Sequence, residues 1–290
     1  MKGFSEYLQG LQYRPSSISN ILRNARRFTQ WLDGENLTAG QCTYSDLLSL
    51  VKHFREQNYS IHNINCHIGG IQHYLEYQRQ QGKASHNPAV NLRVKGTREQ
   101  LPSDLLSRHQ IEQIYEQYQP ETPVQKRNKI ILGLLVNQAL VREELQNLEP
   151  RDINLQKGNI RIRKAIRLQE RTLKLSASQI LPLQEYINDV RPALLKLKCQ
   201  ESEKLLITIG ESQHIKETMR ELLNGLQKKH PFLRSFIQIR TSMISIWIKE
   251  RNIREVQYMA GHNSILNTQR YVRANLDELK NQLDLFHPLR

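Results

Sequence analysis

The sequence predicts a mainly α-helical protein of two domains, the second of which includes a small antiparallel β-sheet. Three observations lead there. Apolar residues recur at three- and four-residue steps through most of the chain, one short central stretch alternates apolar and polar residues, and a weakly patterned basic segment separates two helical regions. With 290 residues the chain has room for two cores. We place a helical domain at residues 1–90, a linker at 91–104 and a second domain at 105–290.

Three amphipathic helices are expected in the first domain, at residues 15–32, 47–54 and 60–75. Each keeps its apolar residues on one face. The third contains Gly69 and Gly70, which weaken the prediction because each glycine costs about 1 kcal/mol in a helix interior. The face of the first helix that lies opposite its apolar residues carries three arginines, Arg23, Arg26 and Arg27.

The second domain is expected to mix helices with one hairpin. Ser107 followed by Gln110 is a capping-box pattern, which predicts the start of a helix. The stretch 130–136 is the most apolar in the chain and predicts a buried helix. Alternation within 152–176 predicts a β-hairpin, and helices are expected again from about Ala177.

Composition points to a polyanionic partner. The formal net charge is +14 and the isoelectric point is about 9.8, an excess of positive charge that is typical of proteins that bind nucleic acid. Solubility alone is the alternative explanation of this charge. No apolar run approaches the roughly 20 residues of a membrane span, and the N-terminus lacks the apolar core of a signal peptide. We expect a cytoplasmic protein with no membrane partner.

The cysteines and histidines favour neither a metal site nor a disulfide framework. No Cys-x-x-Cys pair occurs, and the ten histidines do not cluster at the spacing of metal ligands. We therefore expect no metal and no cofactor. The three cysteines are scattered and are each expected to be small buried residues: Cys42, Cys66 and Cys199.

The most informative stretch is residues 256–271. It contains Gly261 and His262, and Tyr271 follows the histidine after nine residues, with Thr268 between them. The segment resembles the C-terminal active-site motif of tyrosine recombinases, the family of Xer proteins and phage integrases. In that family Leu-Gly-His is followed at this interval by Thr-x-x-Tyr. The alternative is a histidine in a turn and a half-buried tyrosine that closes a helix.

The resemblance extends over the whole chain. Family members have an N-terminal helical, SAM-like DNA-binding bundle, a linker, and a helical catalytic domain with a small antiparallel sheet. The resemblance also implies a helix over 237–248, where periodicity alone does not decide. The sequences of residues 256–262 and of Glu143-Glu-Leu most resemble those of integrases of the Bacteroidetes-type branch.

The resemblance implies a metal-free cleavage of DNA. Such a reaction needs a nucleophile, donors for the phosphate oxygens and an acid for the leaving 5′ oxygen. Tyr271 would attack the phosphate and His262 would donate to it. Arg240 would bind two phosphate oxygens with its planar fork. Lys164 would protonate the leaving oxygen.

Two positions of the second domain depart from the family pattern. Ile237 stands where the family has a histidine, three residues before Arg240. The family's Gly-Leu-Arg-Ile-Ser-Glu-Leu corresponds to residues 139–145, which places Val141 where the first arginine belongs. Arg142 is one position late, and one step on a helix rotates a side chain by about 100°. Arg142 remains a candidate for the missing charge.

The lysine of the hairpin is ambiguous. Counting forward from Gly158 favours Lys164, whereas counting back from Arg171 reaches Ile166. Arg167, near the expected turn, is a further candidate, although an arginine is the weaker acid because its pKa lies above 12.

The resemblance implies double-stranded DNA as the partner and a homotetramer on two duplexes, with no small-molecule substrate. A last apolar stripe, Leu276 to Phe286, would either pack within its own domain or dock on a neighbouring protomer. Three alternatives to an active recombinase or integrase stay open: a degenerate DNA-binding protein of the same fold, a type IB topoisomerase, and a helix-turn-helix regulator. The last does not explain the spacing of His262 and Tyr271.

Overall fold

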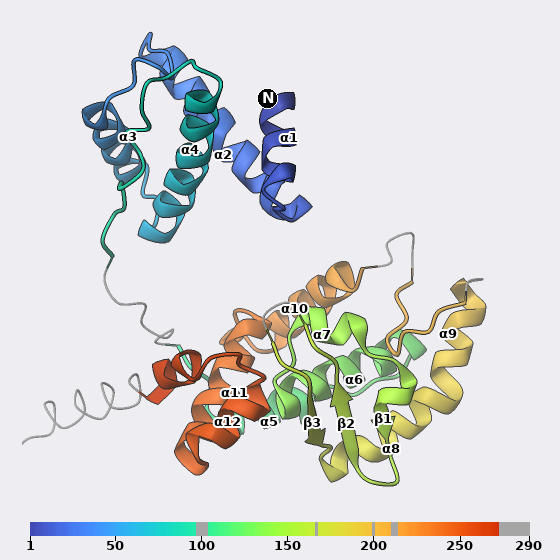
Figure 1. Ribbon diagram of the computed structural model, residues 1–290. Coiled ribbons are helices and arrows are strands. Elements are labelled where there is room, and N and C mark those ends of the chain that lie inside the picture. Colours follow the sequence, from blue (N-terminus) through green and yellow to red (C-terminus); the bar gives the residue numbers. More distant parts are fainter. Residues whose placement is uncertain (97–103, 166–167, 199–200, 210–213, 273–290) are drawn as a thin grey trace, which may run out of the picture. The chain divides into compact units, whose positions relative to one another are not determined.

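Two compact units divide the chain, Met1–Glu99 and Gln100–Arg290, each with its own core. Both consist mainly of helices, and the second also contains a three-stranded antiparallel sheet (Figure 1). The mainly helical fold with one small sheet is therefore confirmed. The structure, a computed structural model, describes residues 1–96, 104–165, 168–198, 201–209 and 214–272.

The first unit is built from four helices: α1 (Lys2–Gly10), α2 (Pro15–Gly34), α3 (Tyr44–Glu56) and α4 (Ile61–Gln80). The three predicted helices, α2 to α4, are confirmed, and their starts have local causes. Proline opens α2, Thr43 and Asp46 form a capping box at α3, and the Ser60 hydroxyl accepts from the third backbone N–H of α4. Periodicity did not reveal α1, which is only nine residues long.

The glycines that weakened the prediction of α4 have a packing function. Gly70 is buried where α4 crosses α2, and a Cβ on Gly70 would lie 2.6 Å from the Cβ of Asn24. Asn24 in turn donates to the backbone oxygen of Cys66, at 2.9 Å. The glycine therefore allows the two helices to approach closely, and this packing offsets its low helix propensity.

The chain after α4 stays on the first unit for some residues. Ala89, Leu92 and Val94 are buried in the core formed by α2, α3 and α4. The Asn65 side chain holds this segment, because it both donates to the backbone oxygen of Val94 and accepts from its N–H. The start of the predicted linker thus packs on the first unit, and residues 97–103 lie outside the described residues.

The second unit surrounds one buried helix, α6 (Pro123–Gln138). This helix contains the apolar stretch 130–136, so the predicted buried helix is confirmed. Its main helical neighbours are α5 (Arg108–Glu116), α8 (Ala177–Glu185), the π-helical turn η2 (Tyr186–Val190), α9 (Arg191–Lys198) and α11 (Phe236–Glu250). The capping box at Ser107 and Gln110 that predicted α5 is also present.

The sheet lies beside this helical core (Figure 1). It consists of β1 (Ile153–Asn154), β2 (Asn159–Ile162) and β3 (Arg171–Lys174), in that order and antiparallel. Side chains of β2 and β3 alternate between core and solvent, which is the pattern that predicted the hairpin. Ile162 pairs with Arg171 and Ala165 bridges Leu168, so the register stays constant to the hairpin's tip.

The remaining elements frame the sheet and α11. They are the helix α7 (Arg142–Asn147), the 3-10 turn η1 (Pro150–Asp152), α10 (Lys216–Lys229), α12 (Ile253–Ala260) and a helix whose described part is 265–272. The apolar stripe expected at 276–286 lies outside the described residues. Within the described ranges, no helix combines the length and apolar character needed to cross a membrane.

Candidate active site

Arg240 lies on α11 and joins the ends of two other helices. Its Nη1 donates to the backbone oxygen of Ala139, after α6, and its Nη2 donates to that of Ala260, at the end of α12, at 2.7 Å. Burial lowers the pKa of the guanidinium, and Glu144 opposes this shift. Arg234, two residues before α11, is mostly exposed and pairs with Asp104 at 3.0 Å. Of the two, Arg240 is therefore the arginine whose position backbone hydrogen bonds fix.

His262 follows a glycine that ends α12. Gly261 has φ +70°, in the left-handed region, and a Cβ there would lie 2.5 Å from Nη1 of Arg171. A larger residue would meet both backbone strain and a buried side chain. The tight turn leaves the His262 side chain 8 % exposed, with Nδ1 at 2.9 Å from Oγ1 of Thr268.

Tyr271 lies on the helix that begins after Ser264, whose hydroxyl accepts from the N–H of Leu266. Ser264 therefore caps the start of this helix. The rings of His262 and Tyr271 stack, with centroids 6.2 Å apart and planes 21° from parallel. Burial raises the pKa of Tyr271, while Arg240 and a hydrogen bond with Thr241 oppose the rise. The structure thus brings three of the predicted site residues together: Arg240, His262 and Tyr271.

The imidazole of His262 is neutral at physiological pH. Burial lowers its pKa to about 4, and the nearby charges of Arg240, Arg171 and Arg270 act in the same direction. A neutral imidazole carries one N–H and one lone pair, so it can donate one hydrogen bond without carrying charge.

The lowered pKa of His262 makes the second unit sensitive to acid. A histidine in the unfolded chain titrates near about 6.5. Between about pH 6.5 and about pH 4 the unfolded state therefore binds a proton at His262 that the folded state does not bind. The stability that His262 contributes is complete above about pH 6.5 and is lost as the pH falls toward about 4. We expect wild-type stability to fall more steeply over this range than that of His262→Gln, as measured by urea titration. Equal slopes would contradict the assignment.

A buried ion pair that we did not predict lies next to the turn that carries His262. Arg171, on β3, and Glu144, on α7, have fully buried side chains and pair at 2.5 Å. Arg171 Nε also donates to the backbone oxygen of Met259, at 2.8 Å. The pair therefore ties β3 and α7 to the end of α12, just before His262. The signal in the sequence was the alternation of β3, which puts Arg171 on the same face as the buried Leu173.

The segment where the family's first arginine belongs lies beside Arg240. Ala139 accepts from Arg240 and has φ +51°, the left-handed conformation that glycine adopts most easily, at the position where the resemblance places a glycine. This conformation supports the register that puts Val141 in the place of the arginine. Arg142, the first residue of α7, is exposed, and no hydrogen bond or ion pair joins it to another described residue.

Lys164 lies on one arm of the hairpin, and the opposite arm touches the histidine turn. The constant register of the hairpin places Lys164 opposite Gln169. The N–H of Gln169 donates to the backbone oxygen of Gly261 at 2.8 Å, and the neighbouring Leu168 forms a bridge with His262. Neighbouring strands are about 4.8 Å apart, so the backbone of Lys164 is about 10 Å from that of Gly261. Lys164 is exposed and makes no hydrogen bond within the described part of the chain. Ile166 and Arg167 lie outside the described residues.

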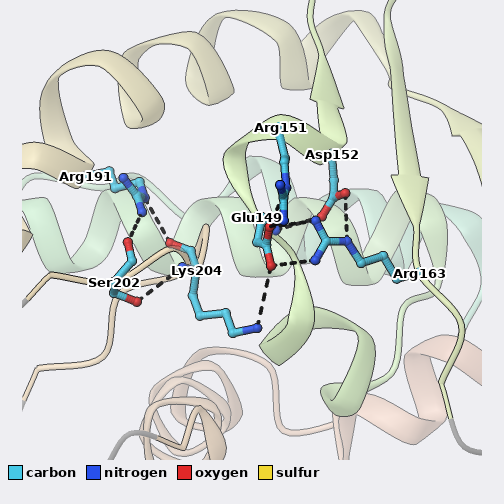
Figure 2. Close-up of polar contacts among 7 residues, drawn as sticks. All are labelled: Glu149, Arg151, Asp152, Arg163, Arg191, Ser202 and Lys204. Carbon is cyan, nitrogen blue, oxygen red and sulfur yellow. Dashed lines mark hydrogen bonds and ion pairs between the residues drawn. The ribbon is translucent and has the colours of Figure 1, made fainter.

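A network of ion pairs anchors the hairpin at the residue before Lys164. Figure 2 shows Arg163 between two carboxylates: it donates to both oxygens of Glu149 at 2.5 and 2.7 Å, and to Asp152 at 3.0 Å. Hydrogen bonds from Arg163 and then Arg151 hold the pKa of Glu149 at about 2. Glu149 therefore stays ionised, and the end of β2 is fixed to η1.

Ile237, in the position of a family histidine, is 74 % exposed in the first turn of α11. It has no polar atom to offer a phosphate beyond its backbone. His230, the nearest histidine along the chain, is 2 % exposed and lies against the ring of Phe232. Across the described ranges, no three His, Cys, Asp or Glu side chains gather as a metal site would require.

Comparison with known proteins identifies one family and its fold. The model of the Phage integrase family matches residues 104–278, more than half of the chain. A tyrosine recombinase XerC of Oceanobacillus iheyensis is 23 % identical, over 98 % of this chain and 94 % of its own length. Two solved structures share the fold. A XerH site-specific recombinase bound to a palindromic difH substrate has a TM-score of 0.75 at 16 % identity, covering 93 % of this chain and 79 % of its own. A lambda integrase(75–356) dimer bound to a COC′ core site has a TM-score of 0.63 at 10 % identity and covers 93 % of each chain.

Proposed function

The chain belongs to the phage integrase family of tyrosine recombinases, and on that basis we propose that it cleaves and rejoins DNA at a specific site through a 3′-phosphotyrosyl intermediate. The observation that carries the proposal is the convergence of Arg240, His262 and Tyr271. The Tyr271 ring stacks on His262, and the pKa values of both groups respond to the charge of Arg240. We infer that one phosphate contacts all three side chains.

Each side chain has a defined part in the proposed reaction. The oxygen of Tyr271 bonds to phosphorus and loses its proton while the bond from phosphorus to the 5′ oxygen breaks. Arg240 and His262 donate to the non-bridging oxygens, where negative charge develops. The ammonium of Lys164 gives a proton to the leaving 5′ oxygen. Since one phosphodiester replaces another, a free 5′ hydroxyl can reverse the step and join a new strand.

The missing first arginine requires another source of positive charge. We assign this part to Arg142, whose side chain is exposed at the start of α7, one residue after Val141. The resemblance to Bacteroidetes-type integrases supports a site that works without the arginine at the usual position. Removing Arg142 tests the assignment, because a true substitute would be needed for cleavage and not for folding.

The partner that we propose is double-stranded DNA, bound by four protomers that hold two duplexes. The net charge of +14 and the DNA-bound recombinases of the same fold support this partner. Since such binding releases counterions from phosphates, affinity should fall steeply with salt concentration. The duplexes to test first are the ends of the genetic element that carries the gene.

Covalent trapping tests the proposed function. The protein is mixed with nicked duplexes from those ends, in which the short strand beyond the cut diffuses away and prevents rejoining. We expect an adduct that survives denaturant, with the nucleotide on the peptide that contains Tyr271. Specific binding without any adduct would instead favour the degenerate DNA-binding protein, for which Val141 and Ile237 are the motivating observations. Relaxation of plasmids without a target site would favour the topoisomerase.

Arg240→Lys should slow cleavage about 10²- to 10³-fold, by analogy with the loss of one oxyanion donor. Lysine retains the charge but not the fork, so it cannot hold the oxygens of Ala139 and Ala260 and also bind a phosphate. The measurement is the single-turnover rate of adduct formation. Arg234→Lys, an exposed arginine near the start of the same helix, is the matched control and should leave the rate unchanged. Equal rates for the two variants would remove Arg240 from the site.

A further inference from the structure

The hydroxyl of Thr268 is fully buried and contacts one polar group. Thr268 is 0 % exposed, and its Oγ1 lies 2.9 Å from Nδ1 of His262. Other hydroxyls on helices of this protein bond to the backbone one turn back, as Ser242 does to Gln238. In the described ranges Thr268 makes no such bond, so the histidine nitrogen is the one partner of its hydroxyl.

This single contact decides which atom carries the proton. If Nδ1 donated to the threonine, the hydroxyl proton of Thr268 would be buried without an acceptor. If the hydroxyl donates to Nδ1, every polar atom of the pair is satisfied. Leaving a buried donor unpaired corresponds to about a 5- to 150-fold preference for the second arrangement. A neutral imidazole with a lone pair at Nδ1 carries its proton on Nε2.

We propose that Thr268 is a positioning residue that donates to Nδ1 and thereby fixes His262 as the Nε2–H tautomer, with that N–H presented to a phosphate oxygen. Nε2 makes no hydrogen bond within the described residues and is not among the buried unsatisfied atoms, so it is the ring nitrogen with access to a ligand. The assignment of the acceptor rests on the proposed function, whereas the tautomer does not.

The geometry also excludes His262 as the base for Tyr271. In this tautomer the nitrogen that reaches the site carries a proton, and the nitrogen with the lone pair is occupied by Thr268. The stacked rings of His262 and Tyr271 place the donor beside the nucleophile without removing its proton. The histidine therefore stabilises charge on the phosphate, and the tyrosine loses its proton to another acceptor.

Nitrogen-15 NMR of the DNA-free, full-length protein tests the tautomer directly. The protein is labelled at its histidine rings, and His262→Gln identifies the signals. At neutral pH we expect a pyridine-type resonance, without a proton, for Nδ1 and a pyrrole-type resonance, with a proton, for Nε2. The reverse pattern would overturn the proposal. Because this measurement needs no cleavage, its outcome is independent of the proposed function.

Two variants separate the hydroxyl from the shape of the side chain. Thr268→Val keeps the volume and removes the hydroxyl, so the Nδ1 resonance should move toward that of an imidazole without a hydrogen bond. Adduct formation should slow about tenfold or more, which is a smaller effect than the loss of a whole oxyanion donor. The affinity for DNA should change less than about threefold. Thr268→Ser keeps the hydroxyl and should retain both the resonance and the rate. An unchanged Nδ1 resonance in Thr268→Val, or equal losses in both variants, would overturn the proposal.

Discussion

Tyr271→Phe should form no covalent adduct with DNA and should still bind it. Phenylalanine keeps the ring that stacks on His262, so the packing of the site is preserved and only the attacking oxygen is lost. No other group takes over, because the reaction requires an oxygen at that position. Denaturing gels measure the adduct, and gel-shift titration of the same duplex measures binding, which should stay within about threefold of wild type.

Tyr258→Phe is the matched control for this experiment. Tyr258 is on α12, 51 % exposed, and its hydroxyl bonds to the backbone N–H and oxygen of Thr172. The variant loses a tyrosine hydroxyl from the same unit without touching the site, so cleavage should persist. An adduct that persists in Tyr271→Phe would assign the attack to a different residue and end the proposed mechanism.

Arg171→Met should destabilise the second unit by about 3–5 kcal/mol, the usual cost of removing one partner from a buried ion pair. The carboxylate of Glu144 would be left at 0 % exposure without its cation. The double variant Arg171→Met/Glu144→Met should recover much of the loss, because no buried charge remains. Urea unfolding measures both. A Trp31→Phe background leaves Trp247, on α11 of the second unit, as the one tryptophan signal.

Arg161→Met gives the comparison on the same hairpin. Arg161 pairs with Glu170 at 2.8 Å, but both side chains are about half exposed or more. Solvent screens such a pair, so its loss should cost less than about 1 kcal/mol. If Arg171→Met and Arg161→Met unfolded at the same urea concentration, burial of the Arg171 pair would have no energetic consequence.

The elements that sequence predicted are those with local causes. Helices α2 to α5 follow from apolar periodicity together with the cap at Ser107, α6 follows from the apolar run 130–136, and the hairpin follows from alternation. The alignment of residues 139–145 with the family motif was also local, and it is consistent with the left-handed conformation of Ala139, where the family has a glycine. These features depend on neighbours within a few residues, which a single sequence displays.

The features that were missed depend on contacts between distant segments. Gly70 was counted as a cost, because its close approach to Asn24 involves another helix. The pairing of Arg171 with Glu144 joins residues 27 positions apart, so the alternation of β3 could place Arg171 on the buried face without identifying its partner. Thr268 was recognised as part of a motif, but its hydrogen bond to His262 requires the fold of the turn.

Because the hairpin and the histidine turn are in contact, we expect them to unfold locally as one unit. The N–H of Gln169 donates to the backbone oxygen of Gly261, and Leu168 forms an isolated bridge with His262, so the turn pairs with the edge of the hairpin. The amide of Gln169 can exchange its hydrogen with solvent only when this edge separates. Its exchange rate therefore measures how often the hairpin and the histidine turn separate, and DNA bound at the proposed site should slow the exchange of this amide along with its neighbours.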